Sequence, residues 1–524
     1  MIPNTVASLM FFPLTTLAPI VLFAAAALFL MRSGRRPGRL LQVAEGSTLI
    51  AIGVVLVGVI QLWSAGSQVY PATGLATLRL DAISVTLAVL VSFIGWIVIR
   101  YARRALDGEA REGTFHGLTL ATVAAVLVLV QAGNLVVLIA SFIAIGIFLR
   151  QLLLFYPERD EARRAASKFI RVWVTGDMTL IVAAALLWQA FGTADIMALT
   201  TAANDGLPAL AQVAVALLVL TALLKTAMLP VHGWLTEVME APTPVSALLH
   251  AGVINAGGVL LITLAGVVQQ SSGAMAVLVM LGGLTSLFAG VVMLTQSAIK
   301  TALAWSTIAQ MGFMLLQCGL GLWPLALLHI VAHSLYKAHA FLSSGNAVRT
   351  VNAIRKPGPV AVPGPGAVLR SFGLALALYG TVALAFTLVV GPKTPQALAL
   401  GAILVFGVSY LIAQGLADAA PGALTRLTVG ASLVTALAYF GFHVAAQALW
   451  GPSLPAPPVA GALEWQLIVL AVLSFGGVAV AQSLFPYWAH HPSTAGLRVH
   501  LTNGLYLNAV FDRMIGGFRV SHKS

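Results

Sequence analysis

The chain contains 524 residues, of which 59% are hydrophobic and only 8% are charged. Because soluble domains carry about 25% charged residues, this composition excludes an ordinary soluble protein and indicates an integral membrane protein. The net charge of +12 does not imply a nucleic-acid partner, since the basic residues cluster in short loops between apolar runs, as membrane topology requires. The single cysteine, Cys318, excludes an internal disulfide and a cysteine-based zinc site.

Apolar runs long enough to cross a bilayer occupy most of the chain and predict an all-α polytopic membrane protein with about fifteen transmembrane helices. The first run has no basic residue before it, whereas Arg32 and Arg35 follow it closely, which is the reverse of a cleavable signal peptide. The predicted spans lie near residues 13–31, 47–64, 82–100, 117–133, 134–155, 169–191, 208–228, 244–268, 275–294, 301–320, 322–344, 368–391, 397–416, 425–447 and 463–485.

The loops between these runs alternate in charge, which predicts the orientation of the chain in the membrane. Most Arg and Lys residues lie in the loops at 32–46, 101–116, 156–168, 295–300, 345–367 and 486–524, and almost none in those at 65–81, 192–207, 269–274 and 448–462. We therefore expect an external N-terminus and a cytoplasmic C-terminus. The tail from Pro486 is too polar to span, and its segment LTNGLYLNAVFDRMIGGF fits either a helix on the membrane surface or a helix that docks a partner.

A series of ionisable residues lies in or beside the central apolar runs. Lys225 precedes the helix-breaking Pro230 by five residues, a turn with Glu240 follows, and the next run carries His250. Charges are costly in lipid, and a broken helix is tolerated there only where protein or water satisfies its backbone, so this arrangement predicts part of a proton or cation path. The alternative for Lys225 is a lysine that snorkels to the interface. Asp177, near the start of the sixth run, belongs either to the same path or to an interfacial helix cap.

A second group of ionisable residues recurs every four positions in the segment HIVAHSLYKAH. His329, His333 and Lys337 share one face of a helix over roughly 12 Å. A lone histidine in a helix is usually structural, but three titratable groups in one line, at a spacing that water can bridge, predict a proton relay.

The same line of residues does not predict a metal site. A histidine pair needs a third protein ligand to form a catalytic zinc site, and the cationic Lys337 one turn away would repel the ion. The sequence also contains no phosphate-binding loop, nucleotide fingerprint or strand-borne serine nucleophile. We therefore expect neither a cofactor nor an enzymatic activity in this chain.

Three segments in a fixed order carry a resemblance to a known family: LLKTAMLPVHGWLTEVMEAPTPVSALLHAGVINAGG, KTALAWSTIAQMGFML and HIVAHSLYKAHAFLSSG. Residues 75–350 resemble the proton-translocating antiporter-like family, which includes the large membrane-arm subunits of respiratory complex I and of Mrp sodium/proton antiporters. That family contains two inverted five-helix repeats, each with a broken helix that bears a central lysine. The resemblance implies that Lys225 is the first-repeat lysine, that His250 relays from it, and that Lys337 bridges to the second repeat. Asp177 also matches a family position.

The resemblance also implies a division of the chain into five parts. These are N-terminal transmembrane helices at 1–116, a first antiporter-like repeat at 117–268, a second, degraded repeat at 275–416, C-terminal transmembrane helices at 417–485, and a cytoplasmic or interfacial tail at 486–524.

Two departures from the family pattern affect the expected path. The fifth span of the family carries a glutamate that pairs with the broken-helix lysine, whereas this sequence has Ile143 at that place and no acid in the span. We therefore expect that control of the Lys225 pKa either differs from that in the family or rests on Asp177 or Glu240. In the second repeat, Lys393 in the sequence GPKTP is the only candidate for the central lysine, and its position fits the outer surface.

A compact chain with these changes is more similar to the DabB branch of the family, which belongs to complexes that accumulate inorganic carbon. That resemblance implies a bacterial inner-membrane subunit whose peripheral partner, DabA, holds a zinc site like that of a β-carbonic anhydrase on the cytoplasmic side. Proton or other cation flow through this chain would drive CO2 hydration in the partner, and larger heteromeric assemblies are expected. The alternatives are an ion-pumping subunit of a complex I-like or Mrp-type assembly, and a non-conducting scaffold.

Overall fold

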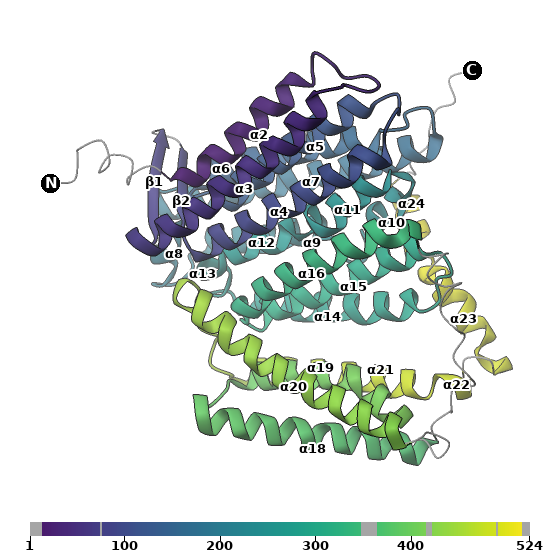
Figure 1. The fold of residues 1–524 in the computed structure, drawn as a ribbon. Coiled ribbons are helices and arrows are strands. Elements are labelled where there is room, and N and C mark those ends of the chain that lie inside the picture. The colour runs from purple at the N-terminus through teal and green to yellow at the C-terminus, as the bar shows by residue number, and fades with distance from the viewer. Residues whose placement is uncertain (1–12, 74–75, 347–363, 416–421, 489–490, 516–524) are drawn as a thin grey trace.

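The computed structural model describes residues 13–73, 76–346, 364–415, 422–488 and 491–515, and most of them form helices whose axes run along one bundle (Figure 1). The first half contains α2 (Leu17–Leu28), α3 (Leu40–Ala65), α4 (Ala82–Ala105), α5 (Glu112–Val130), α6 (Leu135–Leu153), α7 (Asp160–Phe191), α8 (Ile196–Ala203), α9 (Ala209–Lys225), α10 (Gly233–Thr236), α11 (Thr243–Ala251), α12 (Ala256–Thr263) and α13 (Ala265–Val268). The second half contains α14 (Ser272–Met293), α15 (Ile299–Gly319), α16 (Trp323–Ser343), α18 (Pro365–Val390), α19 (Pro395–Gly415), α20 (Gly422–Trp450), α21 (Ala462–Ser483), α22 (Phe485–Trp488), α23 (Ala495–Thr502) and α24 (Leu507–Met514).

The prediction of an all-α multi-pass membrane protein is confirmed. In the described part of the chain, 11 helices are long and apolar enough to cross a membrane, and each of the predicted apolar runs overlaps a helix. The total of fifteen crossings and the division into two inverted repeats stay predictions. Many large apolar side chains on the outer helices are exposed, which suits a surface that lipid covers.

One predicted loop contains regular structure. Residues 65–81 form an antiparallel hairpin of β1 (Gln68–Thr73) and β2 (Ala76–Leu80). Within β2, Arg79 is buried and donates a hydrogen bond to Thr263 at the end of α12, with 3.0 Å between Nη2 and Oγ1. This bond fastens the hairpin to the centre of the bundle. We call the end of the bundle that carries β1 and β2 the hairpin end, and the opposite end, with α10 and α24, the tail end (Figure 1).

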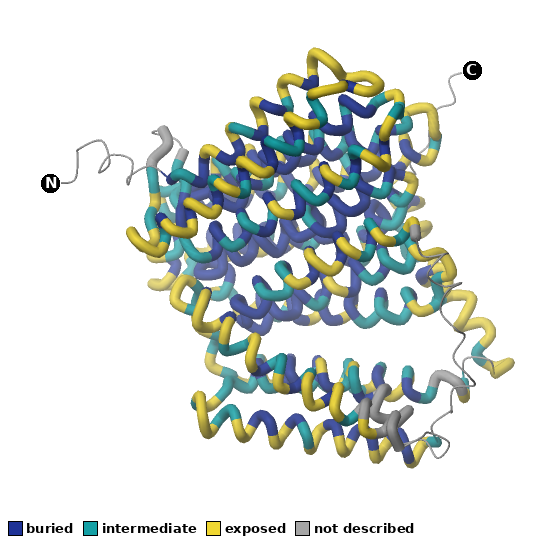
Figure 2. Tube along the Cα trace, in the orientation of Figure 1, coloured by how far each residue is buried: buried dark blue, intermediate teal, exposed yellow. Residues whose placement is uncertain are grey.

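The buried core lies among α4 to α16, and α11 and α12 are its most enclosed span (Figure 2). Helices α18 to α21 lie beside α14–α16 as a second, more exposed layer (Figures 1 and 2). The motif segments singled out in the sequence therefore fall in the enclosed part, where an ionisable side chain is shielded from lipid.

The chain is irregular at two places beside the predicted path. Helix α9 ends at Lys225, and residues 226–242 form a mostly buried turn with α10 and a short 3-10 helix, Glu237–Glu240. The next apolar run was expected to form one helix over 244–268, but it is interrupted at residues 252–255 and again at Leu264. Gly252 ends α11 with φ −117° and ψ −80°, and a glycine has a low helix propensity, so an interruption at this point has a local cause.

The C-terminal tail folds back onto the chain. From α21 it crosses the tail end through α22 and α23, and α24 reaches the turn between α9 and α11 (Figure 1). The sequence left a surface helix and a partner-docking helix open for this segment. In the structure, α24 docks on the polar tail-end surface of its own bundle.

Candidate functional site

Lys225 and Asp177 form a buried ion pair at the end of α9. The two residues are 0% and 4% exposed. The ammonium Nζ of Lys225 donates to Oδ1 of Asp177 on α7 at 2.5 Å and to the backbone oxygen of Trp173 at 2.9 Å. The rule that buried charges need a partner and further hydrogen bonds is met for this lysine. Of the two candidate partners that the sequence offered, the geometry selects Asp177.

A glycine makes room for this pair. A Cβ atom on Gly176 would lie 2.9 Å from Cε of Lys225, closer than carbon atoms normally approach. A side chain at residue 176 would therefore displace the lysine side chain where it passes α7 to reach the carboxylate. In the Gly-Asp pair at the start of the sixth span, Gly176 thus leaves room for the lysine side chain and Asp177 accepts its hydrogen bond.

Aromatic rings complete the surroundings of the ammonium group. The Nζ atom of Lys225 lies 3.8 Å from the centre of the Trp173 ring and 5.1 Å from that of Phe142, distances at which ring faces attract cations. Phe142 belongs to α6, the span that lacks the family's glutamate. Its neighbour Ile143, at the position where the family resemblance places the glutamate, is 37% exposed. Phe142 is the α6 residue whose ring lies near the ammonium of Lys225.

Glu240 does not belong to this pair. Its Oε2 atom lies 3.7 Å from Nη1 of Arg159, and both side chains are 48% exposed. Such a surface ion pair contributes little to stability. Glu240 therefore lies at the tail-end surface, and the expectation that it controls Lys225 is wrong for this conformation.

His250 and Lys337 are joined through two residues of α15. The Nδ1 atom of His250 lies 3.1 Å from Oγ1 of Thr307, and that hydroxyl donates to the backbone oxygen of Leu303 at 2.9 Å. The same oxygen accepts a hydrogen bond from Nζ of Lys337 at 3.1 Å. Because the hydroxyl proton of Thr307 is used, Nδ1 of His250 is the donor to Thr307. The Nε2 atom of His250 is buried without a hydrogen-bond partner among the described residues, and in the tautomer with the proton on Nδ1 it carries the unshared lone pair of the ring.

His333 occupies the place that the interrupted helix leaves open. Its Nε2 atom donates to the backbone oxygen of His250 at 3.2 Å, an oxygen near the interruption that follows α11. The ring of His329 lies 6.0 Å from that of His333, centre to centre. The line of His329, His333 and Lys337 on α16 therefore lies against the end of α11, with His333 in hydrogen-bond contact.

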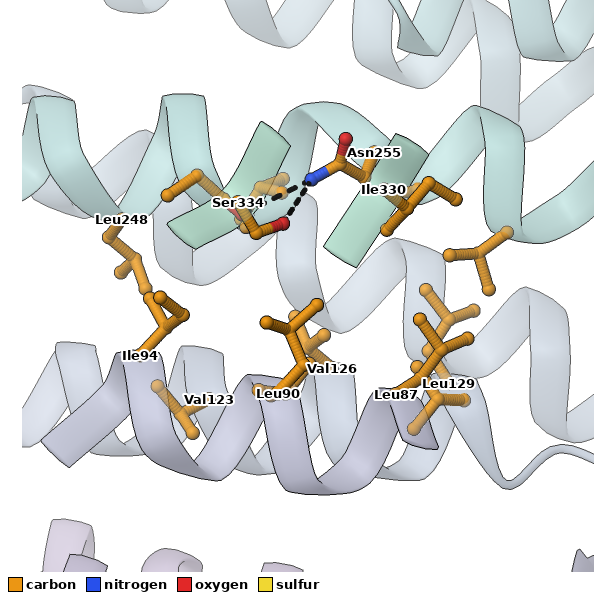
Figure 3. A pocket seen from close by; sticks show the side chains of 17 residues that line it. Leu87, Leu90, Ile94, Val123, Val126, Leu129, Leu248, Asn255, Ile330 and Ser334 are labelled. Carbon is orange, nitrogen blue, oxygen red and sulfur yellow. Dashed lines mark hydrogen bonds between the residues drawn. The ribbon is translucent and has the colours of Figure 1, made fainter. Parts of the chain in front are cut away.

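The two groups are separate in this conformation. Among the described residues, no hydrogen bond links the Lys225–Asp177 pair to the group of His250, Thr307 and Lys337. A cavity of about 40 Å³ lies beside the interruption of α11 and α12, between these helices, α4, α5 and α16 (Figure 3). Its wall is apolar except for Asn255 and Ser334, which bond to each other at 3.1 Å. An apolar cavity tends to stay dry, so this cavity is a packing gap and not a cation path.

Lys393 lies apart from both groups. It is half-buried in the loop between α18 and α19, and this loop is at the hairpin end of the bundle (Figure 1). The expected position near an outer surface agrees with this location if the hairpin end is external. The described structure contains no ion pair of Lys393 with an acidic side chain.

A second buried charge cluster was missed by the sequence reasoning. Lys168 on α7 is 0% exposed, and its Nζ donates to Oε1 of Glu237 at 2.8 Å and to Oδ1 of Asp512 on α24 at 2.6 Å. Arg164 bonds to both carboxylates, at 3.3 Å and 3.2 Å, and Asn508 donates to Glu237 at 3.0 Å. We call these five residues the tail cluster. Lys168 was counted among the basic residues of a loop, and no local signal pairs it with a residue 344 positions away.

Within the tail cluster, burial by itself would raise the pKa of Glu237. Hydrogen bonds from Lys168 and Asn508, together with the charges of Lys168 and Arg164, outweigh that effect and hold the pKa below its ordinary value. The carboxylate of Glu237 is therefore ionised in the folded chain over the physiological range. The cluster contains two cations and two anions, so it is neutral as a whole.

Comparison with known proteins gives a consistent picture. A family profile described as NADH:quinone oxidoreductase/Mrp antiporter, transmembrane region, matches residues 132–381. The chain is 33% identical over 529 residues to "Probable inorganic carbon transporter subunit DabB2" of Halothiobacillus neapolitanus, with 94% of this chain and 93% of the relative covered. It is 43% identical over 265 residues to "Probable inorganic carbon transporter subunit DabB" of Hydrogenovibrio crunogenus, with 50% of this chain and 51% of that relative covered.

A solved structure supports the fold. The chain superposes on one subunit in the structure of the Mrp complex from Dietzia sp. DQ12-45-1b with a TM-score of 0.58 and 24% sequence identity, over 97% of this chain and 57% of that one. At this level of identity the likeness bears on the fold alone.

Proposed function

Because the chain belongs to the DabB family of inorganic carbon transporter subunits, related to the membrane subunits of NADH:quinone oxidoreductases and Mrp antiporters, we propose that it conducts protons for an energy-coupled inorganic-carbon uptake complex. In this role it is a transport subunit without a cofactor of its own. The chemistry of CO2 hydration would belong to a peripheral, carbonic-anhydrase-like partner of the DabA type, whose zinc ion would supply an activated water.

The observation that carries the proposal is the Lys225–Asp177 pair, buried at the end of an interrupted helix. A buried ion pair is weak evidence for a structural role, because an apolar pair of similar size is often at least as stable. Polar contacts between membrane helices have modest structural value. The position of the pair next to a helix break and a cation-binding ring favours transport over a purely structural function.

Lys337 and His250 supply the next steps of the path. The atoms Oγ1 of Thr307 and Nζ of Lys337 share one acceptor oxygen, so they lie no more than about 6 Å apart, a gap that one water bridges. A proton taken up at Nε2 of His250 releases the proton at Nδ1 toward Thr307. When the hydroxyl of Thr307 rotates away from Leu303, it passes its proton toward Lys337. His333 and His329 extend the same line along α16.

The gap between Lys225 and His250 makes the path switchable. A proton crosses it only when Lys225 leaves Asp177 or water enters between α9 and α11. A pump needs such a step, because a permanently continuous path would dissipate the gradient. Asp177 then holds Lys225 in the waiting position, and Lys393 is the exit candidate at the hairpin end.

The orientation follows from the distribution of charge. The basic loops that the structure describes in full, at 32–46, 101–116, 156–168 and 295–300, lie at the tail end together with α10 and α24 (Figure 1). Under the positive-inside rule, the tail end faces the cytoplasm of a bacterial inner membrane, with the N-terminus outside. A peripheral partner of the DabA type would dock at this end.

Growth tests the proposal. Lys225→Ala and Lys337→Ala should each abolish growth in ambient air and leave growth at high CO2 intact, when the chain is the cell's only carbon uptake system. Glu240→Gln is the matched control, because it removes a charge from the exposed surface pair. Normal growth in air of both lysine variants would disprove a proton path through these residues.

The identity of the partner protein distinguishes carbon uptake from a role in a respiratory or Mrp-type assembly. A large zinc protein that co-purifies with the chain supports carbon uptake, whereas redox or antiporter subunits would indicate a respiratory or Mrp-type assembly. Carbon uptake is favoured by the degree of identity, because the DabB2 relative is 33% identical over 94% of this chain, whereas NADH-quinone oxidoreductase subunit L of Mycobacterium tuberculosis is 28% identical over the same share.

A further inference from the structure

The tail cluster connects three segments that are far apart in the sequence. Lys168 belongs to α7, Glu237 to the turn after the broken helix, and Asp512 to α24. A Cβ atom on Gly233, at the start of α10, would lie 2.4 Å from Cγ of Asn508. The C-terminal helix is thus in direct contact with the turn, and a side chain at residue 233 would displace Asn508 from its present position.

The turn in question covers the Lys225–Asp177 pair from the tail end. Lys168 and Asp177 are nine positions apart on α7, which is roughly 13 Å along a helix. The rings of Phe169, Trp173 and Trp234 pack against one another at 5.2 to 6.5 Å. Phe169 and Trp173 lie on α7 between the two charged positions, and Trp234 comes from the turn. The indole nitrogen of Trp234 also donates to the backbone oxygen of residue 224 at 3.2 Å, so the turn and the end of α9 are bonded to each other.

These rings form a plug between the tail cluster and the buried pair. Trp173 is the residue whose ring and backbone oxygen both contact the ammonium of Lys225. All three rings are buried, at 1% exposure or less. Because the Trp234 ring belongs to the turn and is bonded to the end of α9, movement of the turn would displace it from this plug.

We propose that α24 is a latch, fastened on Lys168, that holds the turn between α9 and α11 closed and so keeps protons at the tail end from reaching Lys225. Lys168 and Asp512 act as positioning residues, since they contact neither the transported proton nor Lys225. The inference deepens the proposed function and rests on it, because it assumes that Lys225 accepts protons. It adds a control point that the proposed path does not contain: the state of the C-terminal tail sets access to the path.

The cluster has the energetics that a latch needs. Its charges cancel, so docking α24 leaves no net charge buried. Removal of one carboxylate leaves two cations, Lys168 and Arg164, against one anion. The loss of even one charge-assisted hydrogen bond changes an equilibrium about tenfold or more. Undocking of the tail is therefore sensitive to a single charge.

The test compares Asp512→Asn with Arg513→Gln in the full chain together with whatever subunits co-purify with it. Both changes remove one charge from α24, but Arg513 is exposed and Asp512 is buried. In liposomes with an imposed pH gradient, we expect Asp512→Asn to raise passive proton flux about tenfold and Arg513→Gln to leave it unchanged. Asn508→Ala, which keeps all charges, should give a smaller increase in passive proton flux. It replaces Asp512→Asn in the test if that variant fails to fold.

Two further readouts distinguish a latch from a general loss of structure. Hydrogen exchange should accelerate together in residues 507–514 and 233–240 of Asp512→Asn, with α4 and α5 unchanged. The extra flux should disappear in the double variant Asp512→Asn/Lys225→Ala, because it runs through Lys225.

An unchanged flux in Asp512→Asn, when exchange shows that the tail has undocked, would overturn the latch. So would an extra flux that persists without Lys225. These outcomes are separate from the proposed function, which the growth of the Lys225→Ala and Lys337→Ala strains in air decides.

Discussion

Replacement of Asp177 by Asn leaves the ammonium of Lys225 buried without its counter-charge. The Nζ atom of Lys225 lies 2.5 Å from Oδ1 of Asp177, and the two residues are 0% and 4% exposed. Removal of one partner of such a pair costs about 3–5 kcal/mol of stability. Because Lys225 keeps its bond to the backbone oxygen of Trp173 and the Trp173 ring, we expect Asp177→Asn to fall at the lower end of that range.

The double-mutant cycle with Lys225→Met isolates the pair. Lys225→Met leaves the carboxylate of Asp177 buried and uncompensated, so it should also cost about 3–5 kcal/mol. The double variant leaves no buried charge, and we expect it to be no less stable than either single variant, which gives a coupling energy of about 3 kcal/mol. Both single variants should lose proton flux.

The assay is equilibrium unfolding of the full chain in detergent micelles, with Glu240→Gln as the control. Loss of the exposed Glu240–Arg159 pair should change stability by no more than about 1 kcal/mol. Additive effects of Asp177→Asn and Lys225→Met would refute a direct buried ion pair. Single costs below about 1 kcal/mol would show that water reaches the site.

Three further predictions concern the residues around the path. Gly176→Ala should displace the side chain of Lys225, lower the free energy of unfolding by about 1–3 kcal/mol and reduce proton flux. The control is Gly290→Ala on α14, where a Cβ meets nothing within 4 Å, and it should change neither quantity. Equal flux in the two variants would contradict the close contact at Gly176. Thr307→Val should lower proton flux and cost about 1–2 kcal/mol, and Thr307→Ser should restore the flux, so a Val variant with full flux would remove Thr307 from the relay. Because the folded pKa of Glu237 lies below its unfolded value, its stabilisation of the docked tail is complete above that unfolded value and is lost as the pH falls through the folded pKa. Hydrogen exchange of α24 should therefore accelerate in acid, and the part of this pH dependence that comes from residue 237 should disappear in Glu237→Gln.

The membrane class and the candidate lysines were predictable because both are local properties of the chain. A run of apolar residues forms a helix in lipid whatever its neighbours are, since its backbone has no other partner. Lys225, His250 and Lys337 stood out because a charge in such a run is rare. Their motifs also carried the family resemblance, and the comparisons confirm that relationship.

The details of the sites depended on contacts that no local pattern contains. The sequence offered Asp177 and Glu240 as partners of Lys225, and only the packing of α7 against α9 selected Asp177. The role of Thr307 also required the structure, because a threonine in an apolar helix is common and usually bonds to its own backbone. Here the hydroxyl of Thr307 also donates to its own helix, at the backbone oxygen of Leu303. Because Lys337 donates to the same oxygen and His250 contacts the hydroxyl, Thr307 lies between these two residues.

The sequence by itself determined that this chain is a membrane protein of the antiporter-like family with ionisable residues inside its helices. The tertiary structure alone decided that Lys225 is held by Asp177 and that the tail returns to fasten on Lys168. The physical reason is the distance along the chain over which each interaction acts. Hydrophobic runs and helix breaks act over a few residues, whereas an ion pair between positions 168 and 512 exists only after the whole bundle has formed.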